Sequence, residues 1–103
     1  MPISGFQRPL MTWSQESINK VEPKAGVFEF YDQYELVIYV ASATNVREAL
    51  QNFYNTSFSQ RPCLRQATHF RWEYTDKIEN ALLNHMIVFK STSGGAPPEC
   101  NNQ

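Results

Sequence analysis

The sequence has no apolar run long enough to cross a lipid bilayer. A membrane-spanning helix needs roughly 18 or more consecutive apolar residues, and polar residues interrupt every apolar stretch here well before that length. The first ten residues, MPISGFQRPL, also lack the apolar core of a secretion signal. We therefore expect a soluble, cytoplasmic protein with no membrane partner.

A strong excess of charge is also missing. The formal net charge is −1, which excludes the strongly basic character of many nucleic-acid-binding domains. The charges are unevenly placed, however, because positions 51–71 hold no Asp or Glu but include Arg61, Arg65, Arg71 and His69. This stretch predicts a local positive patch that could bind phosphate, and the alternative is an ordinary solvated loop.

Cysteine and histidine are scarce, with two of each: Cys63, Cys100, His69 and His85. None of them shows the short spacing typical of zinc ligands, so we expect no metal site from this set. The two cysteines could form one disulfide. Because nothing in the sequence indicates an oxidising compartment, we expect reduced thiols.

The composition that remains is typical of one globular domain. Of the 103 residues, 42% are hydrophobic and 14% aromatic, too apolar for a disordered chain and enough for one core. We expect residues 1–24 to form a flanking segment with a short helix that ends before Pro23. The main domain is then expected to occupy residues 25–103.

Three segments have the aromatic and β-branched composition of strands. The first two, 27–31 and 35–40, are separated by the turn-prone Asp32 and Gln33, and they predict a hairpin. The second is apolar on both faces, which favours a central strand covered by helices on both sides. The third, 67–74, alternates between aromatic and charged residues.

Two longer segments have helical periodicity. The first follows Thr44 or Asn45, either of which can cap a helix, and its apolar stripe comprises Val46, Ala49, Leu50 and Phe53. The second spans 78–89 and places His85 in an apolar stripe, where a histidine is more often a hydrogen-bonded core residue than a ligand or base. The predicted fold is therefore α+β, with a small antiparallel sheet of about three strands flanked by helices.

The order of several short motifs resembles that of a GIY-YIG endonuclease domain. The motifs are GVF at 26–28, YVA at 39–41, SATNVREAL at 42–50, HFRWEYTD at 69–76 and PPECN at 97–101. The resemblance covers roughly residues 25–101. It implies the same α+β fold and a relation to enzymes that hydrolyse phosphodiesters with one divalent metal ion.

The residues that the resemblance implies for catalysis are only partly present. Tyr39 matches the second signature tyrosine, and Asn101 matches the asparagine that closes the family's domain. Phe28 stands in the place of the first tyrosine and has no hydroxyl group. Ala41 replaces the signature glycine, which adds a methyl group where the backbone should approach a ligand closely.

The cation and the metal ligand of the family are missing from their positions. The family's arginine falls at Ala49, and Arg47 points about 200° away from that position around the helix. The family's metal-binding glutamate falls at His85 or, with a shifted register, at Leu83. No acid occurs between Asn80 and Pro98.

We therefore predict a catalytically degenerate GIY-YIG-like domain, a pseudoenzyme that acts as a small binding or regulatory module. The ligand is nucleic acid or a protein, and no cofactor is expected. The expected binding surface is the face of the sheet around Tyr39, His69, Arg71 and His85, together with two loop arginines. The candidate nucleic-acid-binding residues are Arg61, Arg65, His69, Arg71 and Asn101.

The alternative is an active endonuclease with a rearranged site that uses Mg²⁺ or Mn²⁺. Its catalytic residues would be Tyr39, His85 and Arg47. Tyr31 or Tyr34 would join Tyr39 near the phosphate, Arg71 could replace Arg47 as the cation, and His85 would act as metal ligand or base. Phosphoryl transfer needs positive charge against the developing negative charge and a positioned nucleophile. This alternative therefore requires these side chains to meet at one place.

Overall fold

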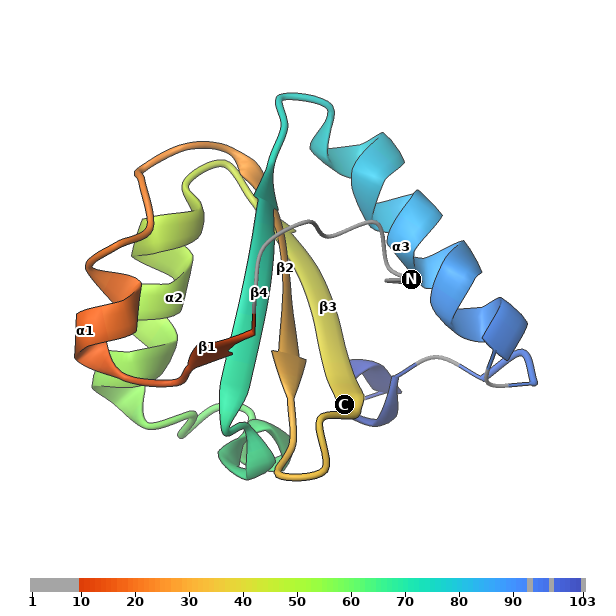
Figure 1. Cartoon of the computed structure of the whole chain (residues 1–103), viewed down its shortest axis with the longest axis horizontal. Coiled ribbons are helices and arrows are strands. Elements are labelled where there is room, and N and C mark those ends of the chain that lie inside the picture. The colour runs from red at the N-terminus through yellow and green to blue at the C-terminus, as the bar shows by residue number, and fades with distance from the viewer. Residues whose placement is uncertain (1–9, 93, 97, 103) are drawn as a thin grey trace.

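The computed structural model describes residues 10–92, 94–96 and 98–102. The structured elements within these ranges are short strands and helices (Figure 1). In chain order they are β1 (Met11–Thr12), α1 (Gln15–Ile18), β2 (Gly26–Tyr31), β3 (Val37–Ala43), α2 (Val46–Thr56), the 3₁₀-helix η1 (Pro62–Gln66), β4 (His69–Tyr74), α3 (Ile78–Thr92) and the 3₁₀-helix η2 (Glu99–Asn102).

The strands form one antiparallel sheet in the order β1-β4-β2-β3. The predicted α+β fold is confirmed, and the two-residue strand β1 extends the expected three strands to four. The expectation that the second strand of the hairpin is central was wrong, because β3 lies at the edge and β2 lies in the middle. Alternation of apolar residues indicates which faces are buried, but it does not identify the neighbours of a strand.

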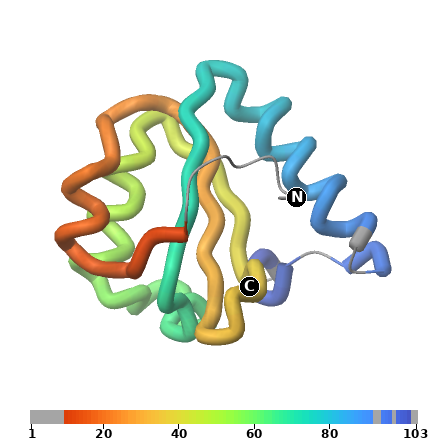
Figure 2. The backbone as a smooth tube through the Cα atoms, viewed as in Figure 1, coloured from red at the N-terminus to blue at the C-terminus, as the bar shows by residue number. Residues whose placement is uncertain are grey.

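Helices cover the sheet from both sides, with α1 and α2 on one side and α3 on the other (Figures 1 and 2). Side chains of β2 alternate between the two layers, as the two-residue period of a strand requires. Phe28 and Phe30 belong to the cluster that includes α2, whereas Val27 packs with Ala81 and Leu82 of α3. We call these two sides the α2 face and the α3 face.

The α2 face holds most of the core. Phe30 and Phe70 are completely buried, and Trp13 packs edge-on against both, with ring centroids 5.0 Å and 5.6 Å away. Leu50 of α2 and Ile18 of α1 are also completely buried in this cluster. The flanking segment before β2 is thus part of the domain's core from Met11 onward.

Both helices of the α2 face are capped at their N-termini by polar side chains. The side-chain oxygen of Asn45 accepts a hydrogen bond from the backbone N–H of Glu48, and Ser14 does the same for Ser17. Each cap satisfies one of the N–H groups that a helix start leaves without a partner. One of the two predicted caps of the longer helix, Asn45, is therefore confirmed.

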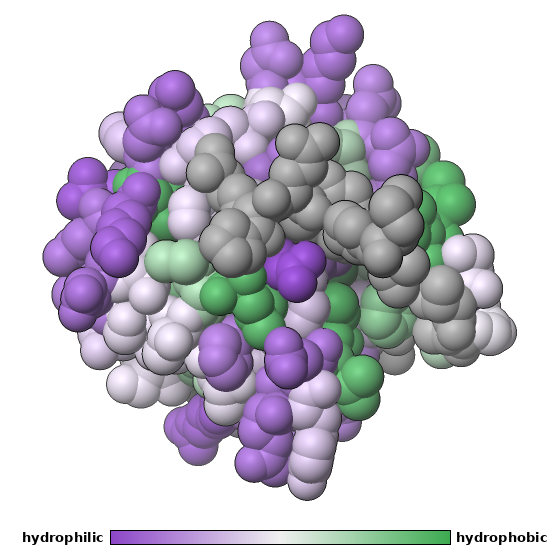
Figure 3. Space-filling view, viewed as in Figure 1, coloured by the Kyte–Doolittle hydropathy of each residue, from purple (hydrophilic) through white to green (hydrophobic). Residues whose placement is uncertain are grey.

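The outer side of α3 is also partly apolar. Leu83 and Ile87 lie one helical turn apart and are 59% and 55% exposed. In the view of Figure 3, hydrophilic residues dominate the side of α1 and α2, and apolar residues gather at the margin where α3 lies. The apolar residues of α3 are therefore not confined to one stripe.

No helix within the described ranges is long and apolar enough to cross a membrane.

A disulfide joins Cys63 of η1 to Cys100 of η2. The expectation of reduced thiols was therefore wrong for this structure. The two residues are 37 positions apart in the sequence, and their proximity depends on how the two 3₁₀-helices fold back against the sheet. Cys100 is completely buried in the core of the α2 face, so the bond ties the end of the chain to that core.

Candidate functional site

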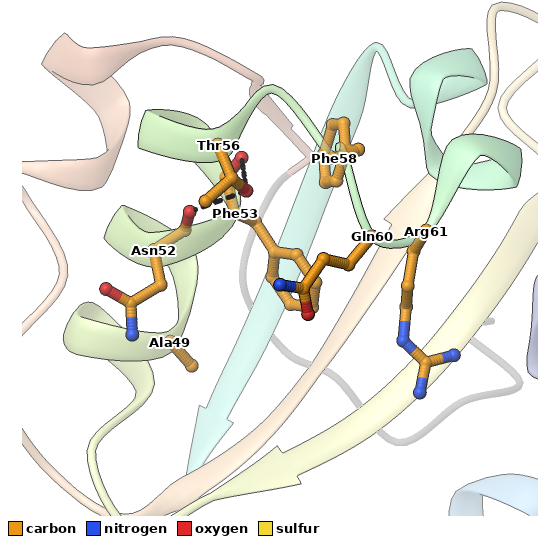
Figure 4. A pocket seen from close by; sticks show the side chains of 7 residues that line it. All are labelled: Ala49, Asn52, Phe53, Thr56, Phe58, Gln60 and Arg61. Atoms are coloured by element: carbon orange, nitrogen blue, oxygen red, sulfur yellow. Dashed lines mark hydrogen bonds between the residues drawn. The ribbon is translucent and has the colours of Figure 1, made fainter.

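An open hollow of about 560 Å³ lies between α2 and the segment that follows it. We call it the α2 hollow. Figure 4 shows α2 supplying one wall and the segment that leads to η1 supplying the other. The residues that line it are Ala49, Asn52, Phe53, Thr56, Phe58, Gln60 and Arg61.

The wall formed by α2 follows from helical spacing. Ala49, Asn52, Phe53 and Thr56 are three or four residues apart, so their side chains lie on one side of the helix. The Phe53 ring packs edge-on against Phe30 at a centroid distance of 5.6 Å. The small side chain of Ala49 leaves room at the start of this wall, where the family resemblance places an arginine.

The opposite wall depends on a sharp change of chain direction after α2. Ser57 and Phe58 both have left-handed backbone conformations, with φ of 50° and 59°. Such a conformation costs roughly 1–2 kcal/mol for a residue with a side chain. The turn buries Phe58 to 5% exposure beside Trp13, with the rings stacked 5.4 Å apart. The packing of Phe58 offsets the backbone cost and positions Arg61.

Arg61 lies over Tyr39, with the guanidinium carbon 5.3 Å from the ring centroid. This geometry is typical of a cation–π contact, which holds the cation over the face of the ring. Tyr39 is 8% exposed and is stacked on Phe30 at 6.1 Å. Arg61, which lines the α2 hollow, therefore lies against the ring of a buried tyrosine.

Asn101 holds the backbone beside Tyr39. Its Nδ2 donates a hydrogen bond of 2.9 Å to the carbonyl oxygen of Val40, and its Oδ1 accepts one of 2.9 Å from the Val40 N–H. This pair satisfies both backbone groups of a residue on the edge strand, where no neighbouring strand can do so. Asn101 thus positions β3, and both ends of its side-chain amide are engaged.

The disulfide links the two segments that contact β3 at this point. Cys63 follows Arg61 by two residues, and Cys100 immediately precedes Asn101. The disulfide therefore joins the segment that carries Arg61 to the segment that carries Asn101.

The structure does not bring the predicted site residues to one surface. Tyr39 belongs to the α2 face. In the antiparallel register, His69 and Arg71 pair with Tyr31 and Glu29, and these four side chains lie on the α3 face. The expected surface that joins Tyr39 with His69, Arg71 and His85 is therefore wrong, because the sheet separates them.

The α3 face carries a buried polar cluster instead. The hydroxyl group of Tyr31 donates a 2.6 Å hydrogen bond to the Glu29 carboxylate, which is 1% exposed. The guanidinium carbon of Arg71 lies 5.4 Å from the centroid of the Tyr31 ring. His85 is 4% exposed, with Nε2 3.3 Å from Glu73 Oε1. His85 is thus a hydrogen-bonded core residue.

The remaining arginines differ in position. Arg47 is exposed on α2 and does not line the α2 hollow, so the rearranged catalytic set Tyr39, His85 and Arg47 is not assembled. Arg65 lines a neighbouring hollow. The cation beside Tyr39 is Arg61, which the sequence named as a candidate nucleic-acid-binding residue but did not place beside Tyr39. The turn that places it has no signal in the sequence.

A divalent metal ion does not fit the α2 hollow. Its lining includes the oxygen-bearing residues Asn52, Thr56 and Gln60 but no carboxylate, and Mg²⁺ or Mn²⁺ prefers carboxylate ligands. The Arg61 guanidinium would also repel the ion. Nor does the part of the chain that the structure describes contain a cluster of three or more His, Cys, Asp or Glu side chains suited to a metal.

Comparison with known proteins identifies the fold. No protein-family profile matches the sequence, and no curated protein matches it significantly. Among solved structures, the chain is similar to the GIY-YIG N-terminal endonuclease domain of UvrC from Thermotoga maritima, a point mutant bound to the catalytic divalent cation. The TM-score is 0.63 at 17% identity, over 84% of this chain and 92% of the other. The resemblance to the GIY-YIG domain is thus confirmed for the fold.

Proposed function

We propose that this chain is a GIY-YIG-like domain that binds nucleic acid at the α2 hollow without hydrolysing it. The proposal rests on one observation. Arg61 supplies a cation beside Tyr39, while the hollow offers no carboxylate for a metal ion. Positive charge against phosphate supports binding, whereas metal-dependent hydrolysis needs a ligand set that these residues do not provide.

The charge distribution favours nucleic acid over a protein partner. The lining of the α2 hollow contains Arg61 and no acid, and the sequence has no Asp or Glu at positions 51–71. An arginine beside aromatic rings is a common arrangement at sites that bind phosphate and bases. The net charge of −1 predicts weak binding that involves few phosphates.

Two parallel assays test the proposal. Fluorescence anisotropy in EDTA measures binding of labelled single-stranded, double-stranded and branched DNA and RNA. Gel analysis with Mg²⁺ or Mn²⁺ measures cleavage of the same substrates. We expect binding that weakens with salt, and no cleavage. We expect Arg61→Gln to weaken binding about tenfold or more, as loss of a charged hydrogen bond predicts.

The matched control is Lys90→Gln, which removes one positive charge from an exposed position on α3, on the other side of the sheet. It should bind like the wild type. Cleavage that is lost in Tyr39→Phe or His85→Ala would instead support the active endonuclease. Failure of every nucleic acid to bind would overturn the proposal and favour a protein partner.

A further inference from the structure

A second hollow of about 600 Å³ adjoins the first. We call it the Trp13 hollow. Its lining residues are Trp13, Tyr54, Thr56, Ser57, Phe58, Arg65 and Ala67. It differs from the α2 hollow in that the segment before β2 contributes one wall through Trp13.

We propose that the two hollows bind adjacent nucleotides of a single-stranded nucleic acid. The inference rests on the proposed function and adds the class of nucleic acid to it. The α2 hollow would hold one nucleotide beside Arg61, and the Trp13 hollow would hold the next beside Arg65.

The two hollows repeat the same chemistry. Each is lined by one arginine and at least two aromatic residues, and neither lining includes an acid. Proteins that bind single strands combine aromatic rings, on which bases stack, with positive charge that follows the phosphates. Two such combinations side by side match two successive nucleotides, each of which has one base and one phosphate.

Two residues line both hollows, which places the hollows next to each other. Phe58 and Thr56 line both of them. The rings of Trp13 and Phe58 are stacked, with centroids 5.4 Å apart, and Tyr54 lies edge-on to Trp13 at 5.6 Å. Tyr54 is 37% exposed, so part of its ring is open to a ligand.

Base stacking explains why a duplex should bind less well. The bases of a duplex are paired and stacked on each other, so their flat faces are not available to Tyr54 or Trp13. An unpaired base exposes these faces. A site that depends on ring contacts therefore discriminates against the duplex, whereas a site that depends on phosphate contacts alone does not.

The test compares a labelled 12-nucleotide oligo(dT) with a duplex of the same length by anisotropy. We expect the single strand to bind more tightly. Tyr54→Ser should weaken it about fivefold or more, as loss of one stacked base predicts. Arg65→Gln should lower the slope of log affinity against log salt by about 0.7, as loss of one phosphate contact predicts. Lys90→Gln is the control.

Tryptophan fluorescence provides an independent readout. We expect the strand to quench the emission of Trp13, and Trp13→Phe should abolish this quenching. Trp72 is 5% exposed, so the ligand should quench its emission only slightly. Circular dichroism of each variant checks the fold, and Arg65 is exposed, so its substitution should leave the core intact.

The outcomes separate the inference from the proposed function. If Arg61→Gln weakens binding but Tyr54→Ser and Arg65→Gln bind like the wild type, the Trp13 hollow is not used, and only the inference fails. Equal or tighter binding of the duplex has the same consequence. If neither the oligonucleotide nor the duplex binds, both proposals fail.

Discussion

The two faces of the sheet are built from different chemistry, although neighbouring residues of the same strands supply both. On the α2 face, Phe28 and Phe30 join a network of aromatic rings. On the α3 face, Glu29 and Tyr31 form a buried hydrogen bond. Alternate residues of β2 therefore enter a layer of aromatic rings and a layer in which a buried hydrogen-bonded carboxylate lies beside the aliphatic contacts of Val27.

The two layers should respond differently to substitution. Aromatic packing is distributed over many contacts, so the cost of a change depends on the volume removed. A buried carboxylate depends on a few specific partners, so the cost depends on whether they remain. The candidate binding site lies on the aromatic face, where Arg61 lines the hollow and contacts the Tyr39 ring.

Removing the centre of the aromatic face should have the largest effect. Phe30 is completely buried, and its ring contacts Trp13, Tyr39 and Phe53 among others. We expect Phe30→Ala to lower the free energy of unfolding by about 3–5 kcal/mol. Urea denaturation measures this value. The control is Tyr34→Ala, at a residue that is 73% exposed, and a similar loss there would contradict the assignment of the core.

Removing the disulfide tests whether a covalent link secures the rim of the same face. Cys63 and Cys100 close a loop with a sequence separation of 37. Loop entropy predicts a loss of about 3–4 kcal/mol for the double variant Cys63→Ser/Cys100→Ser. Urea denaturation of the wild type with and without a dithiol reductant should give a similar difference. A reduced protein as stable as the oxidised one would show that the bond adds nothing.

Removing a single hydroxyl group tests the polar face. Tyr31 is 6% exposed and donates its 2.6 Å hydrogen bond to Glu29. Tyr31→Phe keeps the ring and removes the donor to a buried carboxylate, so we expect a loss of about 1.5–3 kcal/mol. Tyr34→Phe is the matched control. A loss below about 0.5 kcal/mol, within the range of neutral surface substitutions, would show that the polar face does not depend on this bond.

The sequence predicted the elements better than their arrangement. Local signals located the hairpin, the cap at Asn45 and the helices α2 and α3, because each depends on residues that are close together in the chain. The edge position of β3 was missed, since burial on both faces does not reveal what lies beside a strand. The disulfide was missed because nothing in the sequence indicates an oxidising compartment, and the two cysteines are 37 positions apart.

The candidate site was predicted only in part. Tyr39 and Asn101 were identified from the motif order, and the structure places Asn101 against the strand that carries Tyr39. Arg61 could not be connected to Tyr39 because the connection depends on the left-handed turn at Ser57 and Phe58. His85 and Arg71 were grouped with Tyr39, but the register of β4 against β2 places Arg71 on the opposite face, and α3 carries His85 to that same face.

The smallest predicted effect lies at the edge strand, where the two faces meet. Asn101→Ala removes both hydrogen bonds to Val40, but water can replace part of them at a sheet edge, so we expect a loss of only about 1 kcal/mol. Hydrogen exchange of the Val40 amide should become faster, because its acceptor is lost. Asn101→Asp keeps that acceptor but replaces the donor with a carboxylate oxygen that faces the Val40 carbonyl. It should therefore protect the amide better than Asn101→Ala does. Equal exchange in both variants would show that Asn101 does not hold the strand beside Tyr39.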